Sequence, residues 1–486
     1  MFRSARSTVP LAVGAFAVSL GALLLRFLVP RPVGLTDNGD GWRLLCQVGA
    51  SDGDRVGDEF VELMYRGSNS CVSVYAASQV WLARLAQWIG ALLDDPAALN
   101  LIILGVVGCV LAAIAVAAVT VGLPLALGWR LPLGALVLLL VADSAFFGYL
   151  ASVVTEGPAF VGIVLAVGGL LRMQRPGGGR YAGAVCAAAG AILAVNAKPQ
   201  TLMIFPLFVL ALLVARKPGR TRPARWAAPV AVAVAVAGVS AAVQQAGAPK
   251  DALYGTEEMN AYHAIFNSIV DGHHDTAGDL ADLGLPQEFA AFIGTRIWDA
   301  SEQHPLYERY RNRFTRANLM RYYVTHPERT AQILDRSATD LLTVRADYQG
   351  SFARDAGFPP RTKEFRVPVF SGLFRLVAPL GLVVLLPLWL LLGWAGVRAL
   401  RRGRRDLGTV LLFVLSVALG QYLAAALGEG IENVKHQVIA AFCTGFAMLL
   451  AVATLLPRPR PVEPSPAEPE AETEPVAEPV LQPATR

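Results

Sequence analysis

The chain has 486 residues, of which 54% are hydrophobic and only 16% are charged. Soluble domains carry roughly 25% charged residues and do not need so many apolar runs of about 20 residues, so the composition excludes a soluble protein and indicates an integral membrane protein. The formal net charge of +5 does not indicate nucleic-acid binding, because the bases lie in short loops beside apolar runs, where they set topology and meet anionic lipids.

Ten apolar runs have about the length that a helix needs to cross the bilayer core. They lie near 9–29, 99–127, 133–150, 158–172, 181–196, 199–215, 227–245, 369–397, 407–427 and 436–456. The first run follows a short basic start but lacks a small-residue cleavage site, so we expect a retained helix. The predicted fold class is an all-α polytopic membrane protein with about ten transmembrane helices.

The loops between these runs alternate between two classes. One class is rich in arginine and lysine, as at 172–180 and 398–405, and the other carries acids, amides and isolated bases, as at 37–40 and 429–436. Basic loops stay in the cytoplasm, so the alternation assigns the second class to the outer face. We therefore expect both termini to be cytoplasmic and the chemically useful side chains to be extracytoplasmic.

Composition shifts divide the chain into four parts. These are an N-terminal transmembrane module of about seven helices (1–245, with a first outer loop at 30–98), a large extracytoplasmic domain (246–367), a C-terminal transmembrane module of about three helices (368–457) and a Pro/Glu-rich tail (458–486). The extracytoplasmic domain is polar but rich in aromatic residues, and helical patches at 316–323 and 327–344 predict a mostly helical fold. The tail cannot bury a core and is predicted to be a disordered cytoplasmic segment.

Two further features are predicted within the first outer loop. Apolar residues of the segment 72–93 recur at helical spacing, which predicts an amphipathic helix on the outer membrane surface. Cys46 and Cys71 both fall in this loop, where an oxidising exterior permits a disulfide between them. The alternative is that two cysteines share the loop by coincidence.

The motif Asp37-Asn38-Gly39-Asp40 in the first outer loop is the first candidate for chemistry. Its Asn-Gly pair marks a tight turn that can aim both carboxylates at one point. Two close carboxylates suit a general base or a metal clamp on a phosphate. The alternative is a solvated turn, because aspartate and asparagine are common in turns.

Three charged residues in short outer loops form a second group of candidates. Glu156 either caps the next helix or faces an outer cavity. Lys198 and Lys435 are unusual under the positive-inside rule, and each lies beside polar neighbours, Gln200 and His436 respectively. A cation at the outer membrane edge suits a lipid-linked phosphate; the alternative is a lysine that merely reaches towards water.

All six histidines fall in predicted outer segments. The pair His273–His274 beside Asp271 is a weak candidate for a metal site, because adjacent histidines point in different directions on any regular element. His263, Asn267 and Asp271 are spaced i, i+4, i+8, which predicts one shared helical face, either functional or simply exposed.

The cytoplasmic segments and the membrane interior offer few candidates. We find no Walker lysine motif, no Gly-x-Ser-x-Gly and no Cys-x-x-Cys, so nucleotide binding inside the cell is not expected. The charged residues Arg26 and Asp143 lie towards the outer ends of their runs. Coupled transporters usually carry ionisable groups deep in the bundle, so this distribution favours a site at the outer membrane surface.

The order of the polar motifs carries a family resemblance. The motifs are Thr-Asp-Asn-Gly-Asp at 36–40, Thr-Glu-Gly-Pro at 155–158, Asn-Ala-Lys-Pro-Gln at 196–200, the segment 267–286 ending in Asp-Leu-Ala-Asp-Leu-Gly-Leu-Pro, the segment 322–327, and Glu-Asn-Val-Lys-His at 432–436. Together they make the chain, up to about residue 450, resemble the GT-C class of integral-membrane glycosyltransferases, and more closely WsfD-type bacterial glycan hexose transferases.

This resemblance implies a GT-C-like helix arrangement in a bacterial plasma membrane. It also implies an inverting hexosyltransferase whose donor is a polyprenyl-phosphate sugar and whose acceptor is a cell-envelope glycan or a lipid-linked molecule. The family's first-loop base matches either Asp37 or Asp40. The residues expected to bind the lipid phosphate and the sugar are Asn38, Glu156, Lys198, Gln200, His263, Asn267, Lys435 and His436.

The first-loop motif departs from the acid-x-acid pair that many membrane glycosyltransferases use for a metal, because this chain has acid-x-x-acid. No cofactor is therefore predicted with certainty, and a divalent metal stays an open option. Two other functions compete with the transferase. A flippase for lipid-linked glycans requires a cavity that reaches the cytoplasmic side, whereas a non-catalytic envelope scaffold requires neither Asp37, Asp40 nor Lys198.

Overall fold

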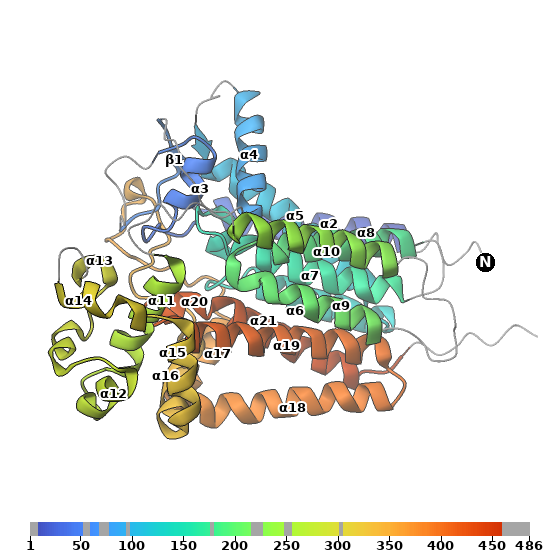
Figure 1. The fold of residues 1–486 in the computed structure, drawn as a ribbon. Coiled ribbons are helices and arrows are strands. Elements are labelled where there is room, and N and C mark those ends of the chain that lie inside the picture. The colour runs from blue at the N-terminus through green and yellow to red at the C-terminus, as the bar shows by residue number, and fades with distance from the viewer. Residues whose placement is uncertain are drawn as a thin grey trace, which may run out of the picture.

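The computed structural model describes residues 8–51, 59–67, 77–93, 98–174, 179–214, 227–246, 255–300 and 305–458. These residues form a mostly helical molecule in which long apolar helices run side by side in a bundle (Figure 1). Polar segments gather at one end, which we call the polar end. The predicted cytoplasmic tail lies outside the described residues.

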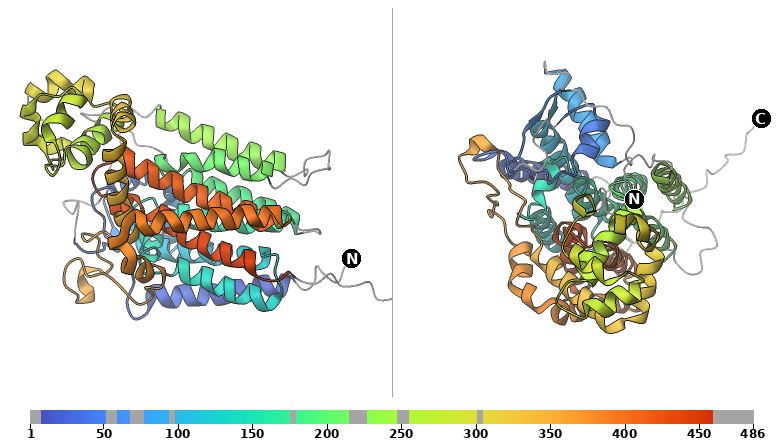
Figure 2. Two further views of the ribbon diagram at one scale, coloured as in Figure 1. Left: turned by 90° about the horizontal axis from the view of Figure 1, so that it is seen from below. Right: turned by 60° about the vertical axis from the view of Figure 1, so that its left-hand side comes forward.

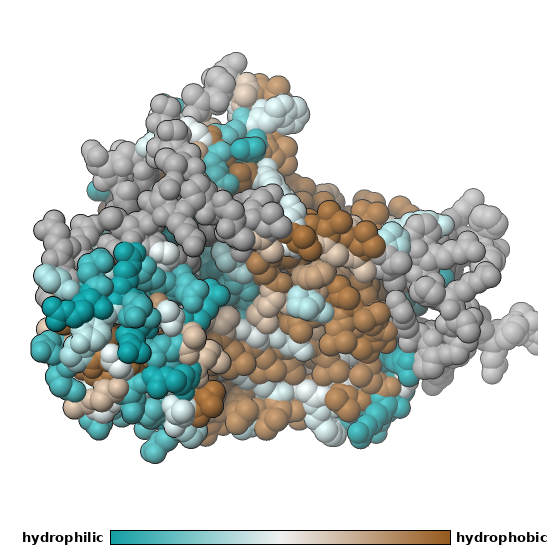
Figure 3. Space-filling view, viewed as in Figure 1, coloured by the Kyte–Doolittle hydropathy of each residue, from teal (hydrophilic) through white to brown (hydrophobic). Residues whose placement is uncertain are grey.

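A helix occupies each of the ten predicted apolar ranges. These helices are α2 (Thr8–Leu28), α5 (Leu101–Gly122), α6 (Leu127–Val141), α7 (Gly157–Met173), α8 (Arg180–Val195), α9 (Ile204–Val214), α10 (Ala227–Ala246), α18 (Gly381–Arg401), α19 (Arg405–Gly428) and α21 (Val438–Leu455). Their outer flank is covered by apolar side chains, whereas the polar end is hydrophilic (Figure 3), so the chain is a membrane protein.

Five helical stretches are long and apolar enough to cross a membrane within the described part of the chain. They are Val9–Leu28, Leu101–Gly122, Phe370–Arg401, Arg405–Gly428 and Val438–Leu455. In the other apolar helices the apolar stretch is shorter, at 10–17 residues. The expectation of about ten membrane crossings in a GT-C arrangement therefore stays a prediction.

Helices α7 and α8 pack closely because glycines line their contact. A Cβ atom at Gly169 would lie only 2.2 Å from the backbone nitrogen of Ala187, and one at Gly190 only 2.4 Å from that of Ala166. Small residues allow such close backbone approach in membranes, where helices associate by packing rather than by the hydrophobic effect.

Gly169→Val is therefore expected to force α7 and α8 apart and to destabilise the bundle. Overpacking a close contact costs typically about 1–3 kcal/mol, which should appear as a lower midpoint of thermal unfolding in detergent. Gly14→Val on α2 is the control, because no atom lies within 4 Å of a Cβ at that position. Equal midpoints for the two variants would contradict the proposed close contact.

The predicted helix 369–397 is broken near its start. Helix α17 (Phe370–Val377) is separated from α18 by Ala378–Leu380, and Gly381 has a φ of +47°. Pro379 lacks a backbone N–H, and Asp335 accepts a hydrogen bond from the backbone N–H of Leu382 at 2.8 Å. This carboxylate satisfies a donor that the break leaves exposed at the start of α18.

The middle of the chain forms a separate polar domain that projects beyond the bundle (Figure 2). Its helices are α11 (Thr256–Ala264), α12 (Thr276–Leu283), α13 (Ile297–Ala300), α14 (Pro305–Tyr310), α15 (Arg316–Thr325) and α16 (Pro327–Thr343). Tyr262, Phe266, Phe289 and Phe314 are buried in its own aromatic core. Helices α15 and α16 match the two predicted helical patches.

The first loop, residues 30–98, holds two helices and one short strand among its described residues, and a second strand follows it directly. They are α3 (Trp42–Gln47), α4 (Ser78–Ala91), β1 (Met64–Tyr65) and β2 (Leu99–Asn100), with the strands antiparallel. Helix α4 lies within the predicted amphipathic segment and exposes Trp81, Leu85 and Trp88 at helical spacing. Cys46 is disulfide-bonded, but Cys71 lies outside the described residues, so their pairing stays a prediction.

A long segment after α16 fastens the first loop to the polar end. Thr36 and Gly350 exchange hydrogen bonds: the Thr36 N–H donates to the Gly350 carbonyl at 3.1 Å, and its hydroxyl accepts from the Gly350 N–H at 2.9 Å. Arg26 and Glu364 form a buried ion pair between α2 and the same segment. These contacts position the turn that carries Asp37 and Asp40.

Candidate active site

A network of charged side chains joins the first loop to the short helix α20 (Asn433–His436). Lys435, whose side chain is 1% exposed, forms ion pairs with Asp40 and with Glu432, the latter at 2.5 Å. Asp40 also pairs with Arg43, and the Asn38 amide donates to both Glu432 oxygens at 2.7 and 2.8 Å. The side chain of Asp40 remains 37% exposed, so a ligand can reach it.

Asp37 and Asp40 have different environments although they share one turn. Asp37 is buried, and its Oδ1 accepts hydrogen bonds from the backbone N–H groups of Gly39 at 3.0 Å and Gly41 at 2.8 Å. Gly39 has a φ of +101°, and a Cβ atom on Gly41 would lie 2.4 Å from Asp37 Oδ2. Asp37 therefore holds the turn, whereas Asp40 projects from it.

A second network lies behind the first. Lys198 forms a buried ion pair with Glu156 at 2.9 Å and lies 3.4 Å from His436 Nδ1. The other ring nitrogen of His436 lies 2.6 Å from Glu429. Lys435 and His436 are neighbours on α20, so this short helix joins the two networks.

The charges on these groups stabilise one another. Burial raises the pKa of the Asp40 carboxyl, but Lys435 and Arg43 outweigh burial and hold that pKa well below its usual range. Burial lowers the pKa of Lys435, but Asp40 and Glu432 hold it well above its ordinary value. Burial likewise raises the pKa of Glu156, but Lys198 outweighs burial and keeps that pKa low. Asp40, Lys435 and Glu156 are therefore ionised throughout the neutral range.

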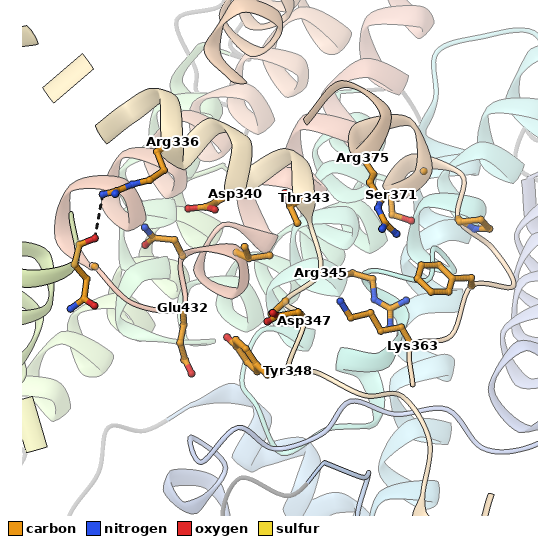
Figure 4. A pocket seen from close by; sticks show the side chains of 18 residues that line it. Arg336, Asp340, Thr343, Arg345, Asp347, Tyr348, Lys363, Ser371, Arg375 and Glu432 are labelled. Atoms are coloured by element: carbon orange, nitrogen blue, oxygen red, sulfur yellow. Dashed lines mark hydrogen bonds between the residues drawn. The ribbon is translucent and has the colours of Figure 1, made fainter. Parts of the chain in front are cut away.

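A cavity of about 760 Å³ adjoins the first network. Glu432 and Asn433 form one side of it, and the end of α16, the segment after α16 and helix α17 form the rest (Figure 4). Its size is within the range of small-molecule sites. Asn267, one of the predicted binding residues, also lines this cavity.

The other predicted site residues lie around these networks. His263 is buried and accepts a hydrogen bond from the Ile297 N–H at 3.1 Å, and burial lowers its pKa to about 4. A Cβ atom on Gly430 would lie 1.9 Å from the His263 carbonyl oxygen, so α11 supports the loop before α20. The Gln200 amide donates to the Gln421 carbonyl at 3.1 Å, which ties its turn to α19.

The predicted i, i+4, i+8 face of His263, Asn267 and Asp271 is not formed. A π-helical turn at Ile265–Ile269 changes the spacing, and the helix ends before Asp271. Asp271 instead lies within ion-pair distance of His274 and Arg329. In the described ranges, no three His, Cys, Asp or Glu side chains are grouped as a metal site requires.

The cavity also contains residues that the sequence analysis missed. Arg345, Lys363 and Arg375 line it together with Tyr348. A sequence signal was available, since Lys363 and Arg375 lie near the predicted outer end of an apolar run, where bases are unusual. Because Arg345, Lys363 and Arg375 are well separated in the sequence, the sequence did not indicate that they line one cavity.

The comparisons with known proteins place the chain in a family. No curated protein matches it significantly. A family model described as the YfdI N-terminal transmembrane domain matches residues 2–465. This match covers most of the chain, including both networks and the cavity, so the chain belongs to the YfdI N-terminal transmembrane domain family.

Proposed function

We propose that the protein transfers a hexose from a polyprenyl-phosphate donor to a cell-envelope glycan or lipid-linked acceptor on the outer face of a bacterial plasma membrane. The observation that carries the proposal is the pairing of a reachable carboxylate, Asp40, with the buried ammonium of Lys435 beside a cavity at the polar end of the bundle. The family match is consistent with a membrane-associated glycosyltransferase-like protein.

In this proposal Asp40 is the general base. It takes the proton of the acceptor hydroxyl as the hydroxyl oxygen attacks the anomeric carbon of the hexose. The bond between that carbon and the phosphate oxygen breaks, and polyprenyl phosphate leaves with the bonding electrons. Because one displacement occurs, the anomeric configuration inverts.

Lys435 links the base to the leaving group. An Asp40 carboxylate held by Lys435 and Arg43 is a weak base. As charge grows on the leaving phosphate, Lys435 turns towards it, which stabilises the phosphate and restores the basicity of Asp40. One well-placed donor to a developing oxyanion is worth about 3 kcal/mol. Lys198 and His436 lie directly behind Lys435, where they pair with Glu156 and Glu429 and hold α20 in place.

The test is hexose transfer by the purified protein in liposomes. We expect radiolabelled polyprenyl-phosphate hexose to label a cell-envelope glycan, and a soluble nucleotide sugar to give no label. Transfer from the nucleotide sugar would contradict the proposal. Movement of the intact lipid-linked sugar across the bilayer without transfer would instead indicate a transporter.

A further inference from the structure

Three bases from separate segments meet on one side of the cavity. Arg345 follows α16, Lys363 lies in the segment before α17, and Arg375 lies on α17. Figure 4 shows the side chains of Arg345 and Lys363 next to each other, with Arg375 directed towards them from the helix. Arg336 and Asp340 lie on the other side of the same cavity (Figure 4).

Among the described residues, none of these three bases forms a direct ion pair with a carboxylate, unlike Lys198 and Lys435. Lys363 and Arg375 form no ion pair or hydrogen bond with another described residue. Arg345 donates only to neutral groups, the Glu364 carbonyl oxygen and, at 2.8 Å, the Ser351 hydroxyl. Burial, Arg345 and Arg375 lower the pKa of Lys363 and together outweigh Asp347, which raises it.

Arg345 and Lys363 are half-buried and Arg375 is exposed. Like charges gathered at one place, two of them partly removed from water, destabilise one another unless an anion joins them. Two more groups line the cavity: the Tyr348 hydroxyl, which is buried without a hydrogen-bond partner, and the carboxylate of Asp347, which is exposed and leaves the combined charge of the three bases and this acid at +2. By contrast, Lys198 and Lys435 are already paired with carboxylates, so neither supplies the initial attraction for an anion.

We propose that Arg345, Lys363 and Arg375 bind the phosphate group of an isoprenoid lipid, a subsite that deepens the proposed transferase function and rests on it. Guanidinium groups hold phosphate through paired hydrogen bonds, and an ammonium adds a point charge.

The surface beside this subsite favours a lipid over free phosphate. Leu376 is 81% exposed, Leu380 51% and Val383 74%, so an apolar surface begins next to Arg375 and continues from α17 onto α18. An isoprenoid chain that follows it enters the membrane while its phosphate stays in the cavity. The cavity extends to Glu432, whose partner Lys435 also pairs with Asp40, so we place the acceptor hydroxyl and the anomeric carbon at this end.

The test is direct binding of farnesyl phosphate to the full-length protein in detergent, with farnesol and inorganic phosphate as comparison ligands. The test variant is Lys363→Gln/Arg375→Gln. Hydrogen bonds to charged groups are strong enough that we expect farnesyl phosphate to bind this variant at least about tenfold more weakly. We expect the affinity for farnesol to be unchanged and the wild-type affinity for farnesyl phosphate to fall with added salt.

Arg361→Gln is the matched control. Arg361 lies two residues from Lys363, is 54% exposed, pairs with Glu59 and does not line the cavity. Its removal should leave binding unchanged. Because Lys363 and Arg375 repel rather than support their surroundings, the double variant should unfold at the wild-type temperature or above, whereas a structural role predicts a lower temperature.

Two outcomes would overturn the proposal: unchanged affinity of the double variant for farnesyl phosphate, or equal wild-type affinity for inorganic phosphate and farnesyl phosphate. The second outcome would identify a free-phosphate site. Weaker binding by the variant, together with no hexose transfer by the wild type, would support the subsite and reject the transferase function, so the two proposals fail separately.

Discussion

Asp40→Asn is expected to lower hexose transfer by about 10²- to 10⁴-fold, the usual contribution of a general base. Asparagine cannot accept the proton of the acceptor hydroxyl, but it preserves the size of the side chain. Glu432 remains as a partner for Lys435, so the fold should survive. The measurement is the initial rate of transfer from a polyprenyl-phosphate hexose at saturating donor, with the thermal unfolding midpoint as the check on folding.

Asp37→Asn is the matched control, because it makes the same chemical change three residues away. The asparagine side-chain oxygen can still accept from the N–H groups of Gly39 and Gly41, as Asp37 Oδ1 does in this turn. Transfer should therefore continue near the wild-type rate. If Asp37→Asn abolishes transfer while Asp40→Asn retains it, the base is Asp37.

Lys198→Met is expected to destabilise the protein by about 3–5 kcal/mol, because it leaves Glu156 as an uncompensated charge in a buried site. The Lys198 and Glu156 side chains are only 9% and 4% exposed, so water cannot replace the missing partner. The measurement is the unfolding midpoint in detergent. The double variant Glu156→Leu/Lys198→Met should recover most of the loss, since replacing both members of a buried pair with apolar residues is often neutral.

The pH dependence gives an independent check on this pair. The folded-state pKa of Glu156 is below its ordinary value of 4.5, so its stabilisation is present above that pH and is lost as the pH falls through the folded pKa. The pKa of Lys198 is above 10.5, so its stabilisation is present below that pH and is lost as the pH rises through the folded pKa. The double variant should lack both losses; identical pH profiles would reject a stabilising pair.

Local patterns predicted the helices well, because length, hydropathy and periodicity are properties of neighbouring residues. Each predicted apolar range contains a helix, and α4 lies where the amphipathic spacing placed it. The predictions failed where a contact or an irregular turn intervened. The π-helical turn at Ile265–Ile269 prevents His263, Asn267 and Asp271 from sharing one helical face. Pro379 and Gly381 divide the predicted helix at 369–397 into two.

The charged residues near the ends of the apolar runs show what tertiary contacts add. Arg26 pairs with Glu364, far along the chain. Asp143 accepts hydrogen bonds from the N–H groups of Phe370 at 2.7 Å and Ser371 at 3.1 Å, so it caps α17. Their positions in the sequence argued against a site deep in the membrane. The structural roles of these two residues, however, were identified only by the fold.

The sequence by itself determined that this is a helical membrane protein and which polar motifs are candidates for chemistry, because burial in lipid requires long apolar runs and leaves polar residues to the connections. Only the tertiary structure separated Asp40 from Asp37, paired Asp40 with Lys435, and brought Arg345, Lys363 and Arg375 to one cavity. Electrostatic interactions depend on distance through space and on burial, and neither follows from spacing along the chain.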